Sequence, residues 1–270
     1  MKKYCDYFII TLLFIISLIY TDNITNIAKD KDPIMKKIKE EALNLKIESV
    51  NAKINDNNII PGINGYELDI NKSYENMKKI NTYNEKLFKY KDIIPQISIS
   101  NIFDKYITSG NKVNRNISIV VYIKDNIEII SKINGIKLNV FINSNIIKNK
   151  KIKTNNNIKI YNGGEDLNYN NINIINTNTF INNNYNTSNY CLNLDKNDNN
   201  LLECSKNKMH TINPLIVDKN IYNTKVNITN GSILYFDENT IDKLYELSSY
   251  IIKKGYNIVY LDELLSEKVN

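Results

Sequence analysis

The 270-residue sequence has no tryptophan, one histidine, three cysteines, four prolines and eight glycines. A single histidine excludes any metal centre in which one chain supplies two histidine ligands. The sequence has no recognisable nucleic-acid-binding motif, so we expect no nucleic-acid partner. Asparagine, isoleucine, lysine and tyrosine are abundant instead, and codon usage in an AT-rich genome explains this composition without a functional cause.

The formal net charge is +6 and the calculated isoelectric point is about 8.9. A basic surface favours anionic wall polymers or lipid headgroups, although lysine-rich codon usage explains the charge equally well. The chain is long enough for one barrel-sized domain and a smaller module.

The N-terminus has the pattern of a membrane-targeting segment. Lys2 and Lys3 precede residues 7–20, an apolar stretch without a charge. Positive residues before such a stretch hold that end in the cytoplasm and send the following chain across the membrane. No small-x-small cleavage site follows, because Ile19 and Tyr20 are bulky. We therefore predict a signal-anchor at residues 1–22, giving a single-pass cell-membrane protein with an extracytoplasmic domain; a cleaved signal peptide and a secreted protein are the alternative.

Residues 23–108 are predicted to form a stalk and a small α+β module. The first part is charged and helix-prone, and the part after residue 46 has short strand patterns with tight turns at Pro61-Gly62 and Asn64-Gly65. No residue in this module has a catalytic pattern. Its expected role is spacing, or packing on the edge of the following domain.

Residues 109–270 alternate strand and helix patterns, which predicts an α/β fold with a right-handed barrel or a wound sheet. Residues 117–123 are an unbroken apolar run, and continuous apolar strands are buried on both faces. Ligands of such folds bind at the carboxyl ends of the strands, where Lys124 and Asp125 follow the first strand and Asn143 the second. The other candidate strands are residues 137–142, 157–161, 172–176, 189–192, 209–217, 232–236 and 257–261, and the clearest helices are residues 198–206 and 240–254.

Four segments of this region resemble the NodB-type polysaccharide deacetylases. The ending TIDKLYELSSYIIKKGYNIVYLDELL is similar to the last helix and strand of that family, and GSILYFDEN is similar to its penultimate strand, GSIILLHD. VVYIKDN occupies the place of the motif T-F-D-D-G, and GIKLNVFINSN that of V-K-A-T-F-F-I-x-G. The resemblance implies an irregular (β/α) barrel that acts on cell-envelope glycan.

The family's chemistry needs a divalent metal such as zinc, held by one aspartate and two histidines, with a second aspartate as base and a late histidine as acid. In the first motif Lys124 stands in the position of the base and Asp125 in that of the metal-binding aspartate. The motif H-S/T-x-x-H aligns with residues 163–167, so both ligand histidines are absent. Glu165 and Asp166 are the weak candidates for an improvised site with Asp125, and a solvated acidic loop is the competing interpretation.

The remaining motifs also lack the residues on which the family's chemistry depends. The motif R-P-P-Y-G falls at residues 188–191 without its arginine or prolines, and Asp237 replaces the late histidine. His210, the only histidine, matches no catalytic position, and a lone histidine near a strand is more often structural. Cys191 and Cys204 either pair in a disulfide, as an extracytoplasmic protein allows, or remain two buried thiols.

The sequence thus predicts a membrane-anchored, deacetylase-like protein with degenerate catalytic motifs and no cofactor. A glycan-binding or scaffolding role is the first hypothesis. An active deacetylase that hydrolyses N-acetyl groups of peptidoglycan or another envelope polysaccharide, with a divalent metal on Asp125, is the second. A structural envelope protein that binds another protein is the third.

Overall fold

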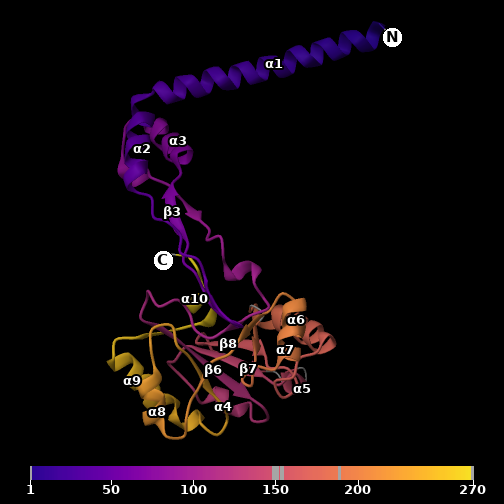
Figure 1. Cartoon of the computed structure of the whole chain (residues 1–270), viewed down its shortest axis with the longest axis vertical. Helices are drawn as coiled ribbons and strands as arrows, with labels where there is room; N and C mark the ends of the chain where they lie inside the picture. The colour runs from indigo at the N-terminus through magenta and orange to yellow at the C-terminus, as the bar shows by residue number, and fades with distance from the viewer. Residues whose placement is uncertain (1, 148–151, 153–154, 188–189, 269–270) are drawn as a thin grey trace. The chain divides into compact units, whose positions relative to one another are not determined.

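The computed structural model describes residues 2–147, 152, 155–187 and 190–268. The chain divides into two compact units (Figure 1): the small unit, Met1–Glu48 with Gly65–Ile93, and the large unit, Ser49–Asn64 with Ile94–Asn270. This division differs from the predicted boundary at residue 108. The reason is that strands before that residue hydrogen-bond into a sheet of the large unit.

The predicted apolar segment lies in α1 (Lys2–Lys31). Within the described residues, Ile10–Lys31 forms one helix that is long enough to cross a membrane, with a mean hydropathy of 1.5 and none of the window buried. An N-terminal signal sequence has the same length and composition, so the helix is consistent with either an anchor or a signal.

The rest of the small unit packs two helices with a two-stranded antiparallel sheet. Asp32 caps the first helix by accepting a hydrogen bond from the N–H of Ile34 at 2.9 Å, and Pro33 occupies the first helical position, where its missing N–H costs nothing. Ile38, Leu68 and Met77 form the buried core. The elements are α2 (Pro33–Asn44), β3 (Gly65–Leu68), α3 (Ile70–Ile80), η1 (Glu85–Leu87) and β4 (Tyr90–Ile93).

The large unit contains a six-stranded parallel sheet, in the order β11-β12-β6-β7-β8 with β13 also paired to β6. The alternation of side chains along the central strand β6 explains its apolar run: Ile119 and Val121 join one core cluster, whereas Val120 and Tyr122 join another. Both faces of the sheet are therefore buried, as predicted. Its strands are β6 (Asn116–Ile123), β7 (Leu138–Ile142), β8 (Ile158–Asn162), β11 (Leu215–Ile216), β12 (Ile233–Phe236) and β13 (Asn257–Val259).

Helices cover one face of this sheet, and a second sheet covers the other. The helix-covered face holds Leu244, Leu247 and Ile251 of α9 against the β6 and β7 residues. The second sheet contributes Ile107 and Ile212 to the opposite cluster. It has the order β1-β2-β5-β10-β9, with β1 (Lys53–Asn55), β2 (Asn58–Ile60), β5 (Tyr106–Ile107), β9 (Tyr190–Leu192) and β10 (His210–Ile212).

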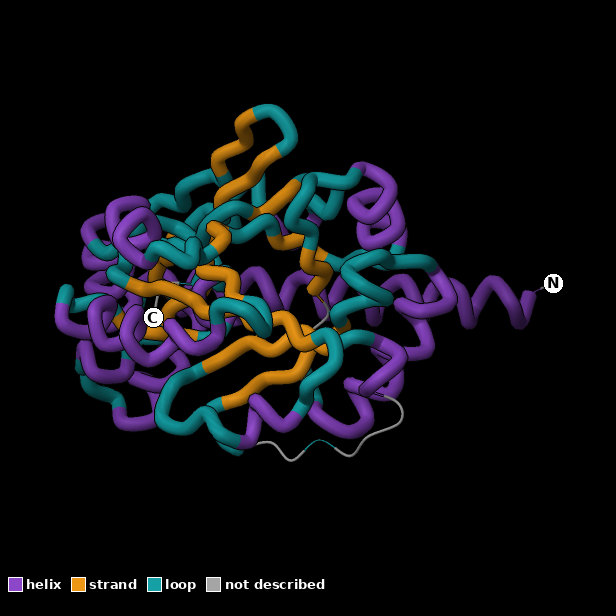
Figure 2. Tube along the Cα trace, turned by 90° about the horizontal axis from the view of Figure 1, so that it is seen from below, coloured by secondary structure: helices purple, strands orange, loops and turns teal. Residues whose placement is uncertain are grey.

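In the large unit, the hydrogen bonds of the described strands therefore run within two separate sheets that share a core. The mixed α/β fold is confirmed, and the single closed barrel stays a prediction. In Figure 2 most strands lie in the middle of the view and helices lie around them, while one pair of strands joined by a short loop projects at the top edge. These helices are η2 (Ile99–Asn101), α4 (Glu128–Ser131), α5 (Ser144–Ile147), α6 (Asn171–Tyr185), α7 (Asp198–Lys206), α8 (Ile221–Asn227), η3 (Ile241–Lys243), α9 (Leu244–Lys253) and α10 (Leu261–Leu264).

The predicted strand at residues 172–176 is wrong, because these residues lie in α6. Asn170 caps that helix by accepting from the N–H of Asn173 at 2.9 Å. Ile174 and Ile181, seven residues apart, face the core, whereas Ile172 is 72% exposed. Ile172 and Ile174 alternate with asparagines, and this spacing of two residues imitates the pattern of a strand. The predicted strand at residues 209–217 divides into β10 and β11, and the predicted helix at residues 240–254 divides into η3 and α9.

Candidate functional site

Three of the predicted site residues, Lys124, Asp166 and Asp237, come together at one edge of the six-stranded sheet. β6, β7, β8 and β12 are parallel, so their carboxyl ends share that edge. A hollow of about 310 Å³ lies there and is lined by eight residues. They are Tyr122, Lys124, Asp166, Leu167, Tyr235, Asp237, Glu238 and Asn239.

Lys124, in the position of the catalytic base, is paired with a carboxylate. Its Nζ lies 3.1 Å from Oδ1 of Asp166, and the same oxygen accepts from Nδ2 of Asn143 at 3.2 Å. Asn143 also donates to Oη of Tyr122 at 3.5 Å. Burial raises the pKa of Tyr122 to about 12, against the effect of the Asn143 hydrogen bond and with a further increase from the Asp166 charge. The phenol therefore stays protonated at neutral pH.

Asp237, in the position of the late catalytic histidine, caps a local turn. Its Oδ1 accepts from the N–H of Asn239 at 3.0 Å and from the N–H and Oγ1 of Thr240, both at 2.9 Å. Its Oδ2 accepts from Nδ2 of Asn239 at 3.2 Å. Burial alone would raise the pKa of this carboxyl, but these hydrogen bonds outweigh burial and hold it below its usual range. Asp237 is thus held as an anion, so a proton-donating role at neutral pH is not supported.

Glu238 occupies a backbone anion site. Its Oε1 accepts from three consecutive backbone N–H groups, those of Lys124 at 3.0 Å and of Asp125 and Asn126 at 2.9 Å each. Successive N–H groups that converge on one point form a nest for an anion. Glu238 therefore fixes the loop after β6 to the loop after β12.

A strained turn forms another wall of the hollow. Asp166 and Leu167 have φ values of 51° and 62°, between Glu165 and Asn168, whose backbone groups exchange two hydrogen bonds of 2.9 Å. Leucine rarely adopts positive φ, and the left-handed conformation costs it about 1–2 kcal/mol. Such strain is concentrated at ligand sites and other functional positions.

The side chains do not fit the metal that the family's chemistry uses. Among the described residues, no group of three or more histidine, cysteine, aspartate or glutamate side chains could hold a metal ion. The carboxylate of Asp166 is committed to Lys124 and Asn143, and the exposed side chains of Asp125 and Glu165 do not line the hollow. We therefore derive no step through a metal.

One of the two aligned histidine positions has no space for a side chain. A Cβ on Gly163 would lie 2.8 Å from the backbone C and O of Ile142 and 2.8 Å from the ring of Tyr122. The Tyr122 ring therefore occupies the volume that a metal-ligating side chain at residue 163 would need.

A second hollow, of about 170 Å³, adjoins the first and shares Asp166 and Leu167 with it. Its other residues come mainly from the loop after β9 and the start of α7: Asn168, Asn193, Leu194, Asp195, Asn197 and Asn200. We call the two hollows together the groove. Sequence reasoning missed Tyr122, Tyr235 and this asparagine-rich wall; the only available signal for the wall was that it follows a predicted strand.

The remaining candidates lie outside the groove lining. His210 stacks on Phe103 with ring centroids 4.7 Å apart, and burial lowers the pKa of its imidazole although the Glu267 charge acts in the opposite direction. Cys191 and Cys204 form a disulfide with a Cα–Cα distance of 6.4 Å. Residues 188–189 of the third motif lie outside the described residues.

A larger hollow, of about 530 Å³, lies in the small unit. Its lining includes Ala42, Leu43, Leu68 and Ile70, with none of the residues that the sequence predicted for a site.

The chain has the mixed α/β fold of the carbohydrate esterase family 4 (CE4) proteins, the polysaccharide deacetylases. The structure is similar to that of BA3943, a CE4 family pseudoenzyme from Bacillus anthracis, with a TM-score of 0.59 and 19% identity over 87% of this chain and 96% of that one. A mutant of BA3943 with restored enzymatic activity matches with the same TM-score and identity, over 87% of this chain and 99% of the mutant.

In sequence, the chain is 22% identical over 169 residues to the uncharacterized protein YlxY of Bacillus subtilis, which covers 55% of this chain and 53% of YlxY. The chain thus spans about half the length of this curated relative. No family model matches the chain. The predicted resemblance to polysaccharide deacetylases is confirmed as a likeness of fold.

Proposed function

We propose that the chain is a catalytically degenerate, deacetylase-like protein that binds an amino-sugar glycan of the cell envelope in its groove. The observation that carries this proposal is the state of the groove's polar groups. Lys124 and Asp166 are paired with each other, and the Asp237 and Glu238 carboxylates accept hydrogen bonds from their own chain. None of these groups is arranged as a base, an acid or a metal ligand, yet the hollow remains.

The composition of the groove suits a sugar. Hydroxyl and amide groups of a glycan need many donors and acceptors. The asparagine side chains of the wall already make hydrogen bonds within the chain, but each amide has two N–H groups and two lone pairs, so part of its capacity can serve a ligand. Tyr122 and Tyr235 supply partly apolar surface. The likeness to a pseudoenzyme of the same fold class supports a role that does not depend on hydrolysis. We propose no resident metal.

We also propose that α1 anchors the protein as a single-pass cell-membrane protein with the large unit outside the cytoplasm, where a disulfide between Cys191 and Cys204 persists. Cleavage of the same helix as a signal sequence would release a secreted protein. Fractionation of cells that express the chain distinguishes these fates by whether the protein stays with the membrane and retains α1.

Binding of chitin and chitosan oligomers to the purified protein, measured by calorimetry, tests the proposed function. Leu167→Trp places a large ring at the wall that both hollows share, and we expect at least about tenfold weaker binding, or about 1.4 kcal/mol. Ile252→Trp is the matched control, because Ile252 is 60% exposed on α9 and lines neither hollow. Absence of saturable binding for both kinds of oligomer would refute the proposal.

A further inference from the structure

The groove is acidic although the chain is basic. Lys124 is its one cationic side chain, against four carboxylates, whereas the whole chain has a net charge of +6. The Lys124 ammonium is paired with Asp166 at 3.1 Å. Three negative charges are therefore uncompensated within the lining, those of Asp195, Asp237 and Glu238.

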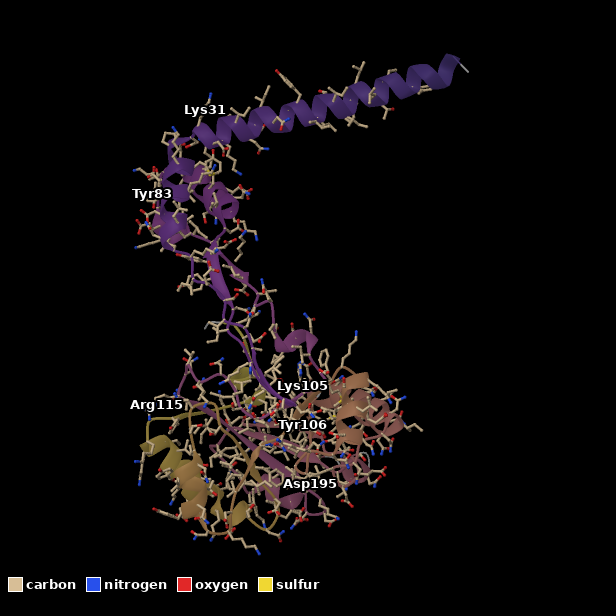
Figure 3. All side chains as sticks on the ribbon, viewed as in Figure 1. Lys31, Tyr83, Lys105, Tyr106, Arg115 and Asp195 are labelled. Atoms are coloured by element: carbon tan, nitrogen blue, oxygen red, sulfur yellow. A yellow bond between two sulfur atoms is a disulfide. The ribbon has the colours of Figure 1, made fainter. Side chains whose placement is uncertain are left out.

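The contacts of these three carboxylates do not neutralise their negative charges. Asp237 and Glu238 accept hydrogen bonds from backbone N–H groups, which carry no net charge and so do not neutralise the carboxylates. Asp195, labelled in Figure 3, is an exposed side chain of the loop after β9. The negative field therefore extends along both hollows.

Tyr235 provides an independent indication of a ligand. Its side chain is only 6% exposed and lines the 310 Å³ hollow of the groove, yet its hydroxyl makes no hydrogen bond to another described residue. Burial, followed by the charges of Asp237 and Asp195, raises the pKa of Tyr235, so the hydroxyl is neutral and can both donate and accept. The hydroxyl lies at the wall of this open hollow and is not sealed in the core, so a ligand or water in the hollow can pair with it.

We propose that the groove selects de-N-acetylated amino sugars, in which a free ammonium group replaces the neutral acetamide. This inference rests on the proposed function and names the ligand class of the same groove. An ammonium gains from the carboxylates, an acetamide carries no charge to gain from them, and an anionic polymer is repelled. The reaction that supplies such a ligand is hydrolysis of an N-acetyl group, in which water releases acetate and leaves the amine.

The size of the preference follows from the charges. Two carboxylates about 5 Å from an ammonium, at the high dielectric of an open groove and with partial screening, favour the charged sugar by about tenfold, or about 1.4 kcal/mol. Because the effect is electrostatic, the preference decreases as salt is added or as the amine loses its proton at higher pH.

The test compares glucosamine and N-acetylglucosamine oligomers of equal length on the full chain, by calorimetry at low and high salt. We expect the glucosamine oligomer to bind about tenfold more tightly at low salt. Asp195→Asn should weaken that binding about threefold and leave the N-acetylated oligomer unaffected. Within the part of the chain that the structure describes, the Asp195 side chain makes no hydrogen bond or ion pair that the substitution would remove. Asp242→Asn is the matched control, because Asp242 is exposed on η3 and pairs with the neighbouring Lys243.

The outcomes separate the two proposals. Equal or tighter binding of the N-acetylated oligomer, blocked by Leu167→Trp, would refute the charge selection and leave the glycan-binding function standing. A preference for glucosamine that survives Asp195→Asn and high salt unchanged would also refute it. Binding of neither oligomer would refute the proposed function itself.

Discussion

Loss of the Cys191–Cys204 disulfide should destabilise the large unit by an amount that follows from the chain between them. Both residues are fully buried, and they pack with Tyr169, Ile174 and Met209. They are 13 residues apart, and closing a loop of this length in the unfolded chain is worth about 3 kcal/mol in the entropy model. Alanine at both positions is the suitable replacement, because a serine hydroxyl would be buried without an assured partner.

Urea unfolding of the double variant, followed by circular dichroism, measures this loss. With a slope of about 3 kcal/mol/M, the expected change of about 3 kcal/mol moves the midpoint down by about 1 M. Reduced wild-type protein should behave like the variant, and Cys5→Ala should not, because Cys5 is outside the pair. The loop that the disulfide closes carries Asp195 and Asn197 of the groove, so glycan affinity should fall as well. A loss below about 1 kcal/mol would contradict the stabilisation expected from closing this loop.

Three further substitutions test the site. Glu238→Ala removes the acceptor of three N–H groups and should lower the free energy of unfolding by about 1–3 kcal/mol in urea unfolding, whereas no loss would contradict the nest. The lowered pKa of Asp237 means that its ionised form stabilises the folded state above the ordinary aspartate range, so wild type should exceed Asp237→Asn in stability at neutral pH. This advantage should disappear as the pH falls through the folded pKa, and a pH-independent difference would contradict it. Gly163→His should unfold the protein or destabilise it by more than about 3 kcal/mol, because Ile142 and Tyr122 occupy the Cβ position; a stable variant that binds zinc would contradict the steric argument.

The central strand pair was predictable because its signal is local. The apolar run of β6 requires burial on both faces, and the six-stranded parallel sheet provides it. The bounds of α7, Asp198–Lys206, also match their prediction, since Asn197 caps its first turn and the apolar residues have helical spacing. The carboxyl-end position of Lys124, Asp166 and Asp237 followed from the parallel arrangement.

The division into two sheets was not predictable, because it depends on pairing between distant segments. β5 pairs with β10, a partner about a hundred residues later in the chain, and no local pattern specifies that register. In the sequence, Tyr235 cannot be distinguished from the other apolar residues of its strand. It becomes a site residue only because its side chain lines the 310 Å³ hollow of the groove. The role of Glu238 needed the backbone geometry of a loop on another strand.

The groove is proposed to bind amino-sugar glycan without hydrolysing it. The most direct measurement follows binding and acetate release together, in one sample of the protein with an N-acetylglucosamine oligomer and added zinc, beside a glucosamine oligomer of the same length. We expect saturable binding that Leu167→Trp weakens by at least about tenfold, and no acetate above the protein-free control. Acetate release that requires zinc and is abolished by Asp125→Ala would contradict it, and so would the absence of binding by either oligomer.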